Sequence, residues 1–181
     1  EMCIRDSRNG EDRGERRLRS AWYRGLMAAE AAIAIRKAAA ADVAAIVAML
    51  ADDALGAQRE DASLPLRDSY RSAFAAIDSD PNQLLAVVEH DGEVIGCMQI
   101  SFIPGLSRMG MWRGQIESVR IASHIRGGGV GRQMIVWAIE QCRERGCGLV
   151  QLTTDKSRSD ALRFYQSLGF TDSHEGLKLS L

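Results

Sequence analysis

The stretch RGGGVG at residues 126–131 constrains the fold of this chain more than any other part of its sequence. It lies between an alternating apolar segment at 113–123 and a segment at 131–146 whose apolar residues recur at helical spacing. Consecutive glycines lose much conformational entropy on folding, so they need a backbone or packing reason to stand together. The pattern therefore predicts a strand, a tight glycine-rich turn and a helix in direct succession.

The size and charge of the chain exclude several classes of protein. Its 181 residues suit one domain with a sizeable core, and 46% apolar with 26% charged residues is a typical soluble balance. A formal net charge of -1 gives no reason to expect a nucleic acid or an anionic membrane as partner. The cysteines Cys3, Cys97, Cys142 and Cys147 lack metal-ligand spacing, and no apolar run is long enough to span a bilayer. We therefore expect no metal, no membrane segment and a reduced, cytoplasmic location.

Residues 1–26 differ from the remainder, because they are rich in arginine and acidic residues and show little apolar periodicity. They lack the apolar core of a signal peptide. Codons for MCIRDS (2–7) resemble the mosaic end used in transposon-based sequencing libraries, which suggests a non-native assembly scar. A genuine disordered extension is the alternative. We expect one domain over 27–181, starting at Met27, behind a disordered or non-native extension.

Apolar periodicity and turn residues predict a mixed succession of elements. Strands are expected at 32–39, in 83–103 as a hairpin around Asp91 and Gly92, and at 113–123, 148–155 and 175–181. Helices are expected at 43–55, 66–77, 131–146 and 161–170, and a loop at 104–111. The expected caps are Asp42 for the first helix, Gly146 for the end of the third, and Ser159 or Asp160 for the last. This order predicts a mixed α+β or α/β sheet protein.

A glycine-rich turn that opens a helix presents backbone N–H groups and the positive end of the helix dipole, a combination that binds phosphate. A nucleotide P-loop does not fit, because no Gly-Lys-Ser/Thr follows. A dinucleotide-binding turn fits poorly, because its third glycine would fall on Met134 and no repeated βαβ unit surrounds it. A turn without a ligand stays open as an alternative.

Three segments of the chain carry a combined signature. They are Arg-x-x-Gly-x-Gly at 126–131, IESVRIAS at 116–123 and SRSDALRFYQSLGF at 157–170, and the last two blocks are separated by one helix and one strand. Together they resemble the motifs of the GCN5-related N-acetyltransferase (GNAT) family over about residues 33–181. Ser123 stands where the family often has proline. Ser159 or Asp160 stands where it often has asparagine, which puts one side-chain contact to the cofactor in doubt.

The resemblance implies the GNAT fold, with a central, mostly antiparallel sheet flanked by helices and the strands at 113–123 and 148–155 splayed apart. It also implies acetyl-CoA as co-substrate. In the family the first splayed strand binds the pantetheine arm and the glycine-rich loop binds the pyrophosphate, with Arg126 and Arg132 either adding charge or lying solvated. The residues expected at the cofactor are Val119, Arg120, Ile121, Arg126, Gly127, Gly128, Gly129, Val130, Gly131, Arg132, Ser159, Asp160 and Phe164.

The implied reaction is acetyl transfer to a primary amine, which has a pKa near about 10 and must lose a proton before it can attack. Glu117 is the candidate base, acting through a water, since strand alternation would place it on the face of Val119 and Ile121. The alternative is a glutamate that pairs with an arginine or only attracts the cationic substrate.

Tyr165 is the candidate general acid, because the family has a tyrosine here that points at the thioester sulfur. An ordinary core role is the alternative. The backbone N–H of Val119 is expected to polarise the thioester carbonyl.

The acceptor is the least determined part of the hypothesis. Acidic residues at 52, 53, 60, 61, 78 and 80 would attract a polycation such as an aminoglycoside antibiotic, or they form a solvated charge run. We expect a small-molecule amine; the alternatives are a protein or peptide amine and a non-catalytic CoA-binding module. His174 near the acceptor is a further hypothesis, since the chain end is similar to aminoalkylphosphonate acetyltransferases. Members of the family often form homodimers, although nothing in this sequence shows one.

Overall fold

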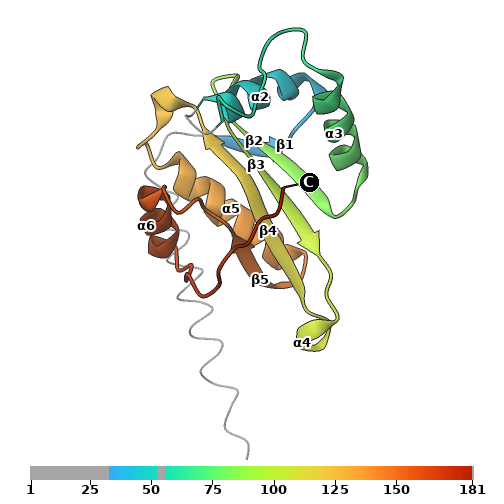
Figure 1. The fold of residues 1–181 in the computed structure, drawn as a ribbon, viewed down its shortest axis with the longest axis vertical. Helices are drawn as coiled ribbons and strands as arrows, with labels where there is room; N and C mark the ends of the chain where they lie inside the picture. Colours follow the sequence, from blue (N-terminus) through green and yellow to red (C-terminus); the bar gives the residue numbers. More distant parts are fainter. Residues whose placement is uncertain (1–32, 53–55, 181) are drawn as a thin grey trace, which may run out of the picture. The chain divides into compact units, whose positions relative to one another are not determined.

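The computed structural model describes residues 33–52 and 56–180 (Figure 1). The expected boundary between residues 26 and 27, and the nature of 1–26, lie outside this part of the chain. The elements are β1 (Ala34–Lys37), η1 (Ala40–Asp42), α2 (Val43–Ala51), α3 (Asp68–Ser79), β2 (Gln83–His90), β3 (Glu93–Ile103), α4 (Ser107–Gly110), β4 (Trp112–Ile121), η2 (Ser123–Ile125), α5 (Val130–Glu144), β5 (Cys147–Leu152) and α6 (Ser159–Ser167).

The strands form one five-stranded sheet in the order β1-β2-β3-β4-β5. All neighbouring pairs are antiparallel except β4 and β5, which run parallel. The turn between β2 and β3 contains Asp91 and Gly92, both with positive φ (49° and 80°), as a tight hairpin turn requires. The mixed α/β fold and this hairpin were predicted correctly.

Helices cover both faces of the sheet (Figure 1). One core contains side chains of α5 together with Ile100 and Ile116 of the central strands. The stripe predicted for α5 is confirmed, because Met134, Ile135 and Cys142 are fully buried in this core. A second core joins α2 and α3 to the opposite face of β2 and β3.

The parallel pair β4 and β5 separates at one end. Their pairing runs from Trp112 and Cys147 to Ile116 and Leu152, where β5 ends. Strand β4 continues to Ile121, so its last five residues have no partner on the β5 side. We call this opening the fork, and it confirms the predicted splay. The unpaired edge of β4 offers backbone groups that a ligand can bind.

Four local expectations were wrong or incomplete. Residues 171–180 contain no strand, and Leu177 and Leu179 are 94% and 87% exposed, so alternating leucines without a neighbouring strand did not suffice. The loop expected at 104–111 includes the short α4. Helix α6 begins at Ser159 without a side-chain cap, so neither Ser159 nor Asp160 caps it. Asp42 does not cap α2; its carboxylate accepts the Ala39 N–H instead.

Candidate active site

A bulge in β4 changes the expected faces of the strand. Cys97 pairs with Arg120 and Gln99 pairs with Glu117, so Met98 faces two residues, Ser118 and Val119. Ser118 has a φ of 53°, the left-handed backbone typical of an extra residue in a strand.

The bulge corrects one expectation about Glu117. Val119 and Ile121 pack against the core that contains α5. Glu117 pairs with Gln99 on β3. Gln99 lies two residues from Cys97, on the face of the sheet that the α2 and α3 core covers. Glu117 therefore lies on that face, opposite to the α5 core. Glu117 therefore does not share a face with Val119 and Ile121. It is exposed and is the first residue of β4 beyond the last pair with β5, at the base of the fork.

The glycine-rich loop joins η2 to α5 as expected. Gly127 and Gly129 have φ values of 92° and 80°, which glycine adopts without steric cost. A Cβ on Gly127 would meet no atom within 4 Å, so the loop is open to a ligand. The N–H groups of Val130 and Gly131 lie in the first turn of α5, where no earlier helical carbonyl can accept them.

Not every N–H group expected to bind the pyrophosphate is free to do so. The N–H of Gly128 donates to the carbonyl of Ile125 at 3.3 Å, and that of Arg132 donates to the carbonyl of Gly129 at 3.0 Å. The donors that remain for an anion are at Gly127, Gly129, Val130 and Gly131. This set has the geometry of an anion site at a helix N-terminus.

The loop, the end of β4 and α6 meet at Gly131. A Cβ there would lie 3.0 Å from Cδ1 of Ile121 and 3.5 Å from Cζ of Phe164. The segment 157–170, which contains α6, thus lies against the glycine-rich loop and the end of β4, the other two segments of the predicted signature. A glycine at position 131 is needed for this close packing of helix against strand.

The side chain of Arg126 is exposed but bonds to the protein itself. Its Nε donates to the carbonyl of Ile121 at 3.1 Å, and its Nη2 lies 3.5 Å from Oδ2 of Asp52 at the end of α2. The guanidinium of Arg126 therefore ties the loop to β4 and α2. Arg120 also bonds locally, since its Nη1 donates to the carbonyl of Val119 at 2.9 Å.

Tyr165 lies on α6, half-buried between two aromatic rings. The Phe164 and Phe170 ring centroids are 5.2 and 5.9 Å from its own, both in edge-to-face geometry. Burial raises the pKa of Tyr165, and the charges of Arg158 and Arg120 partly oppose this rise. The phenol is therefore protonated at neutral pH. Tyr165 packs against the same core as Val119 and Ile121, the residues of β4 in the fork.

The remaining expected residues lie at the surface. Ser159 and Asp160 are exposed in the first turn of α6, where Asp160 pairs with Arg163. His174 is exposed and its Nδ1 is 2.8 Å from the hydroxyl of Ser173.

The acidic residues expected to attract a polycation are largely engaged with the protein itself. Asp78 pairs with Lys37 at 2.7 Å, and Glu60 accepts the hydroxyl of Tyr70 at 2.8 Å. Hydrogen bonds from Ser63 and Arg67 lower the pKa of Asp61 to about 2. Position 53 lies outside the described residues. The described acids do not form a free acidic patch.

Sequence reasoning missed a polar row on β4. Arg113, Gln115 and Glu117 alternate along one face, and Gln115 accepts a hydrogen bond from Nε2 of Gln151 on β5 at 2.7 Å. Gln115 and Gln151 pair with each other next to Ile116 and Leu152, which form the last pair of β4 and β5 before the fork opens. The alternation of polar residues with Gly114 and Ile116 was a usable signal.

The fold and this site define a class of protein in which a strand edge and a helix N-terminus together hold an extended, phosphate-bearing ligand. The family model for the acetyltransferase (GNAT) family matches residues 44–170, so the chain belongs to that family. Membership of this family makes it an acyltransferase, as the sequence predicted.

Two curated relatives support the same class. The chain is 34% identical over 106 residues to an aminoalkylphosphonate N-acetyltransferase of Salmonella typhimurium, covering 59% of this chain and 68% of that protein. It is 31% identical over 90 residues to a glucosamine 6-phosphate N-acetyltransferase of Trypanosoma brucei brucei, covering 50% of this chain and 59% of that protein.

Solved structures agree on the fold. A protein from Bacillus halodurans C-125 named as a transcriptional regulator is 50% identical, with a TM-score of 0.81 over 83% of this chain and 100% of its own. A Trypanosoma brucei acetyltransferase has a TM-score of 0.68 at 24% identity, over 83% and 100% of the two chains. No helix among the described residues is long and apolar enough to cross a membrane.

Proposed function

We propose that this protein transfers an acetyl group from acetyl-CoA to a primary amine of a small molecule. The observation that carries the proposal is the meeting of the fork, the open helix N-terminus and α6 around Gly131. The residues fit the co-substrate, because four N–H donors suit its pyrophosphate and the unpaired edge of β4 suits the amides of its pantetheine arm. Acetyl-CoA supplies the acetyl thioester.

Two side chains handle protons in this proposal. Glu117, exposed at the base of the fork, accepts the proton that the ammonium group of the acceptor must lose, directly or through a water. The Tyr165 hydroxyl, kept protonated by burial, donates to the departing thiolate. A C–N bond forms and a C–S bond breaks. The attacking nitrogen loses its second proton in this step, and that proton replaces the one that Tyr165 gives to the thiolate, so one amide and one thiol result.

The relatives inform the acceptor class. The two curated relatives described above act, by their names, on an aminoalkylphosphonate and on glucosamine 6-phosphate. Both names describe small amines. We therefore favour a small-molecule amine over a protein or peptide amine. An aminoglycoside remains a named candidate, although the acids that suggested it are mostly paired.

The test is release of CoA thiol with a panel of primary amines, together with the mass of the product. The panel should include amino sugars, an aminoglycoside, short aminoalkyl acids and a peptide N-terminus. We expect thiol release only with an amine present, and a product heavier than that amine by one acetyl group. Release with the peptide alone would favour a protein substrate.

A CoA-binding regulatory module is the second candidate, favoured by the name of the 50% identical Bacillus relative. Such a module would bind acetyl-CoA without consuming it. Tight binding together with no thiol release for any amine would favour this candidate over the enzyme.

A further inference from the structure

The sheet face that carries Glu117 also carries a cation that no described residue neutralises. Arg113 lies on the same face of β4, four residues before Glu117. It forms no hydrogen bond or ion pair with any residue that the structure describes, and its Nε is buried. Burying part of a guanidinium without a counter-charge is unfavourable, so an anionic ligand at this position would stabilise it.

Gln115 stands between these two charges. Its Oε1 accepts the hydrogen bond of Gln151, and no other described residue uses its amide nitrogen. The two N–H groups of that amide are therefore free to donate. The bond to Gln151 fixes the orientation of the Gln115 amide, so Gln151 is a positioning residue.

The row is accessible beside the fork. The α2 and α3 core covers the same face over Leu85, Val87 and Cys97, on strands nearer the other edge. Leu149, which pairs with Arg113, is 37% exposed. Neighbouring members of the row are separated by about 6.6 Å along the strand, so their side chains can reach two ends of one small molecule.

The order of charges along the row selects a kind of ligand. A guanidinium and an amide donor bind the oxygens of an anion, and a carboxylate binds an ammonium group. We propose that Arg113 and Gln115 form an anion-binding subsite, so that the acceptor is a small amine that also carries a phosphonate, phosphate or carboxylate group. The inference rests on the proposed function, since Glu117 is placed at the reacting amine.

The experiment compares acceptors that differ only in the anion. The values of kcat/KM are measured with 2-aminoethylphosphonate and with 2-aminoethanol, for wild type and variants. The wild type should prefer the phosphonate, and Arg113→Met should lower its kcat/KM on the order of 10- to 100-fold, the range for hydrogen bonds to charged groups. The rate with 2-aminoethanol should stay the same. Arg108→Met removes an equal charge from an exposed residue of α4 and should change the rate with neither acceptor.

A second variant tests the orientation of the amide. A carboxylate in Gln151→Glu can only accept, so the Gln115 amide turns its N–H groups toward it and away from the ligand. The preference for the phosphonate should fall about 3- to 10-fold, as for loss of a neutral hydrogen bond, although Gln115 is still present. An unchanged preference would contradict the positioning role.

Two outcomes overturn the inference. One is a wild type with no preference for the phosphonate, and the other is an Arg113→Met enzyme that loses activity equally with both acceptors. Calorimetric binding of 2-aminoethylphosphonate separates this failure from that of the proposed function. If 2-aminoethylphosphonate binds only when Arg113 is present, but no acetyl group is transferred, the anion-binding subsite is supported and the proposed acetyltransferase activity is refuted.

Discussion

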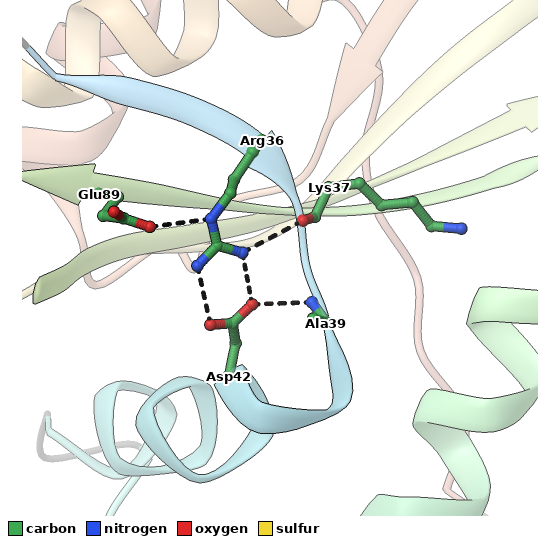
Figure 2. Close-up of polar contacts among 5 residues, drawn as sticks. All are labelled: Arg36, Lys37, Ala39, Asp42 and Glu89. Atoms are coloured by element: carbon green, nitrogen blue, oxygen red, sulfur yellow. Dashed lines mark hydrogen bonds and ion pairs between the residues drawn. The ribbon is translucent and has the colours of Figure 1, made fainter. Parts of the chain in front are cut away.

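The network that joins β1 to the start of α2 provides a quantitative test of the fold (Figure 2). The Asp42 side chain is 9% exposed, and its two oxygens accept Nη1 and Nη2 of Arg36 at 2.7 and 3.0 Å. The same carboxylate accepts the Ala39 N–H at 2.7 Å. Glu89 on β2 accepts the Nε of Arg36 at 2.9 Å. One guanidinium therefore connects the strand pair to the residue that directly precedes α2.

The change Asp42→Ala removes the acceptor of three hydrogen bonds. Hydrogen bonds to charged groups contribute about 1.5–3 kcal/mol, but the Arg36 side chain is 40% exposed and water replaces part of the loss. We expect the free energy of unfolding to fall by about 2 kcal/mol. For a chain of this length that lowers Tm by about 4–8 °C.

The effect should depend on pH in a defined direction. The hydrogen bonds from Arg36 lower the pKa of Asp42 below its ordinary value. A carboxyl group whose pKa is lower in the folded state stabilises the protein at neutral pH, and this contribution is lost as the pH falls through the folded value. The difference in stability between wild type and Asp42→Asn should therefore shrink on acidification.

Urea unfolding followed by circular dichroism measures both effects, at neutral pH and near the lowered pKa. Glu140→Gln is the matched control, since it breaks an exposed pair with Arg143 and should change stability by less than about 0.5 kcal/mol. An Asp42→Ala variant that loses no more stability than the control would contradict the stabilising role of this network. A difference between wild type and Asp42→Asn that is independent of pH would contradict the lowered pKa of Asp42.

Three further outcomes are expected. Tyr165→Phe should lower kcat and leave the KM for acetyl-CoA nearly unchanged, because it removes a proton donor and keeps the ring; an unaltered kcat would exclude the acid role. Glu117→Gln should lower the rate and change its dependence on pH, and an identical profile would remove Glu117 from the base role. Burial raises the pKa of the Cys97 thiol to about 12, so a thiol reagent should label it only after urea unfolding; rapid labelling of the folded protein at Cys97, located by peptide mass, would contradict its burial.

The sequence predicted the elements that follow from local periodicity and turn chemistry. The α5 stripe, the Asp91–Gly92 hairpin and the glycine-rich turn each depend on residues close together in the chain. The motif resemblance added the fork, which no local pattern shows.

The failures have a common physical origin in non-local structure. Strict alternation assigned Glu117 to the wrong face, because the bulge at Ser118 depends on pairing with β3. The alternating leucines near the chain end resemble a strand, but a strand needs a partner that the sequence does not reveal. Asp42 was assigned as a helix cap, whereas its carboxylate accepts hydrogen bonds from the guanidinium of Arg36 on the preceding strand.

We propose that the glycine-rich loop and the fork together form the acetyl-CoA site. The most direct test is the Kd for acetyl-CoA, measured by titration calorimetry for wild type, Gly131→Val and Gly128→Ala. The valine side chain would separate α5 from Ile121 and Phe164, and we expect Kd to rise by about 5- to 150-fold, which corresponds to 1–3 kcal/mol of overpacking. Gly128 has room for a methyl group, since a Cβ there would lie 3.4 Å from the nearest carbonyl oxygen, and its variant should bind as the wild type does. Equal affinity of all three proteins, each with an unchanged Tm, would contradict the account.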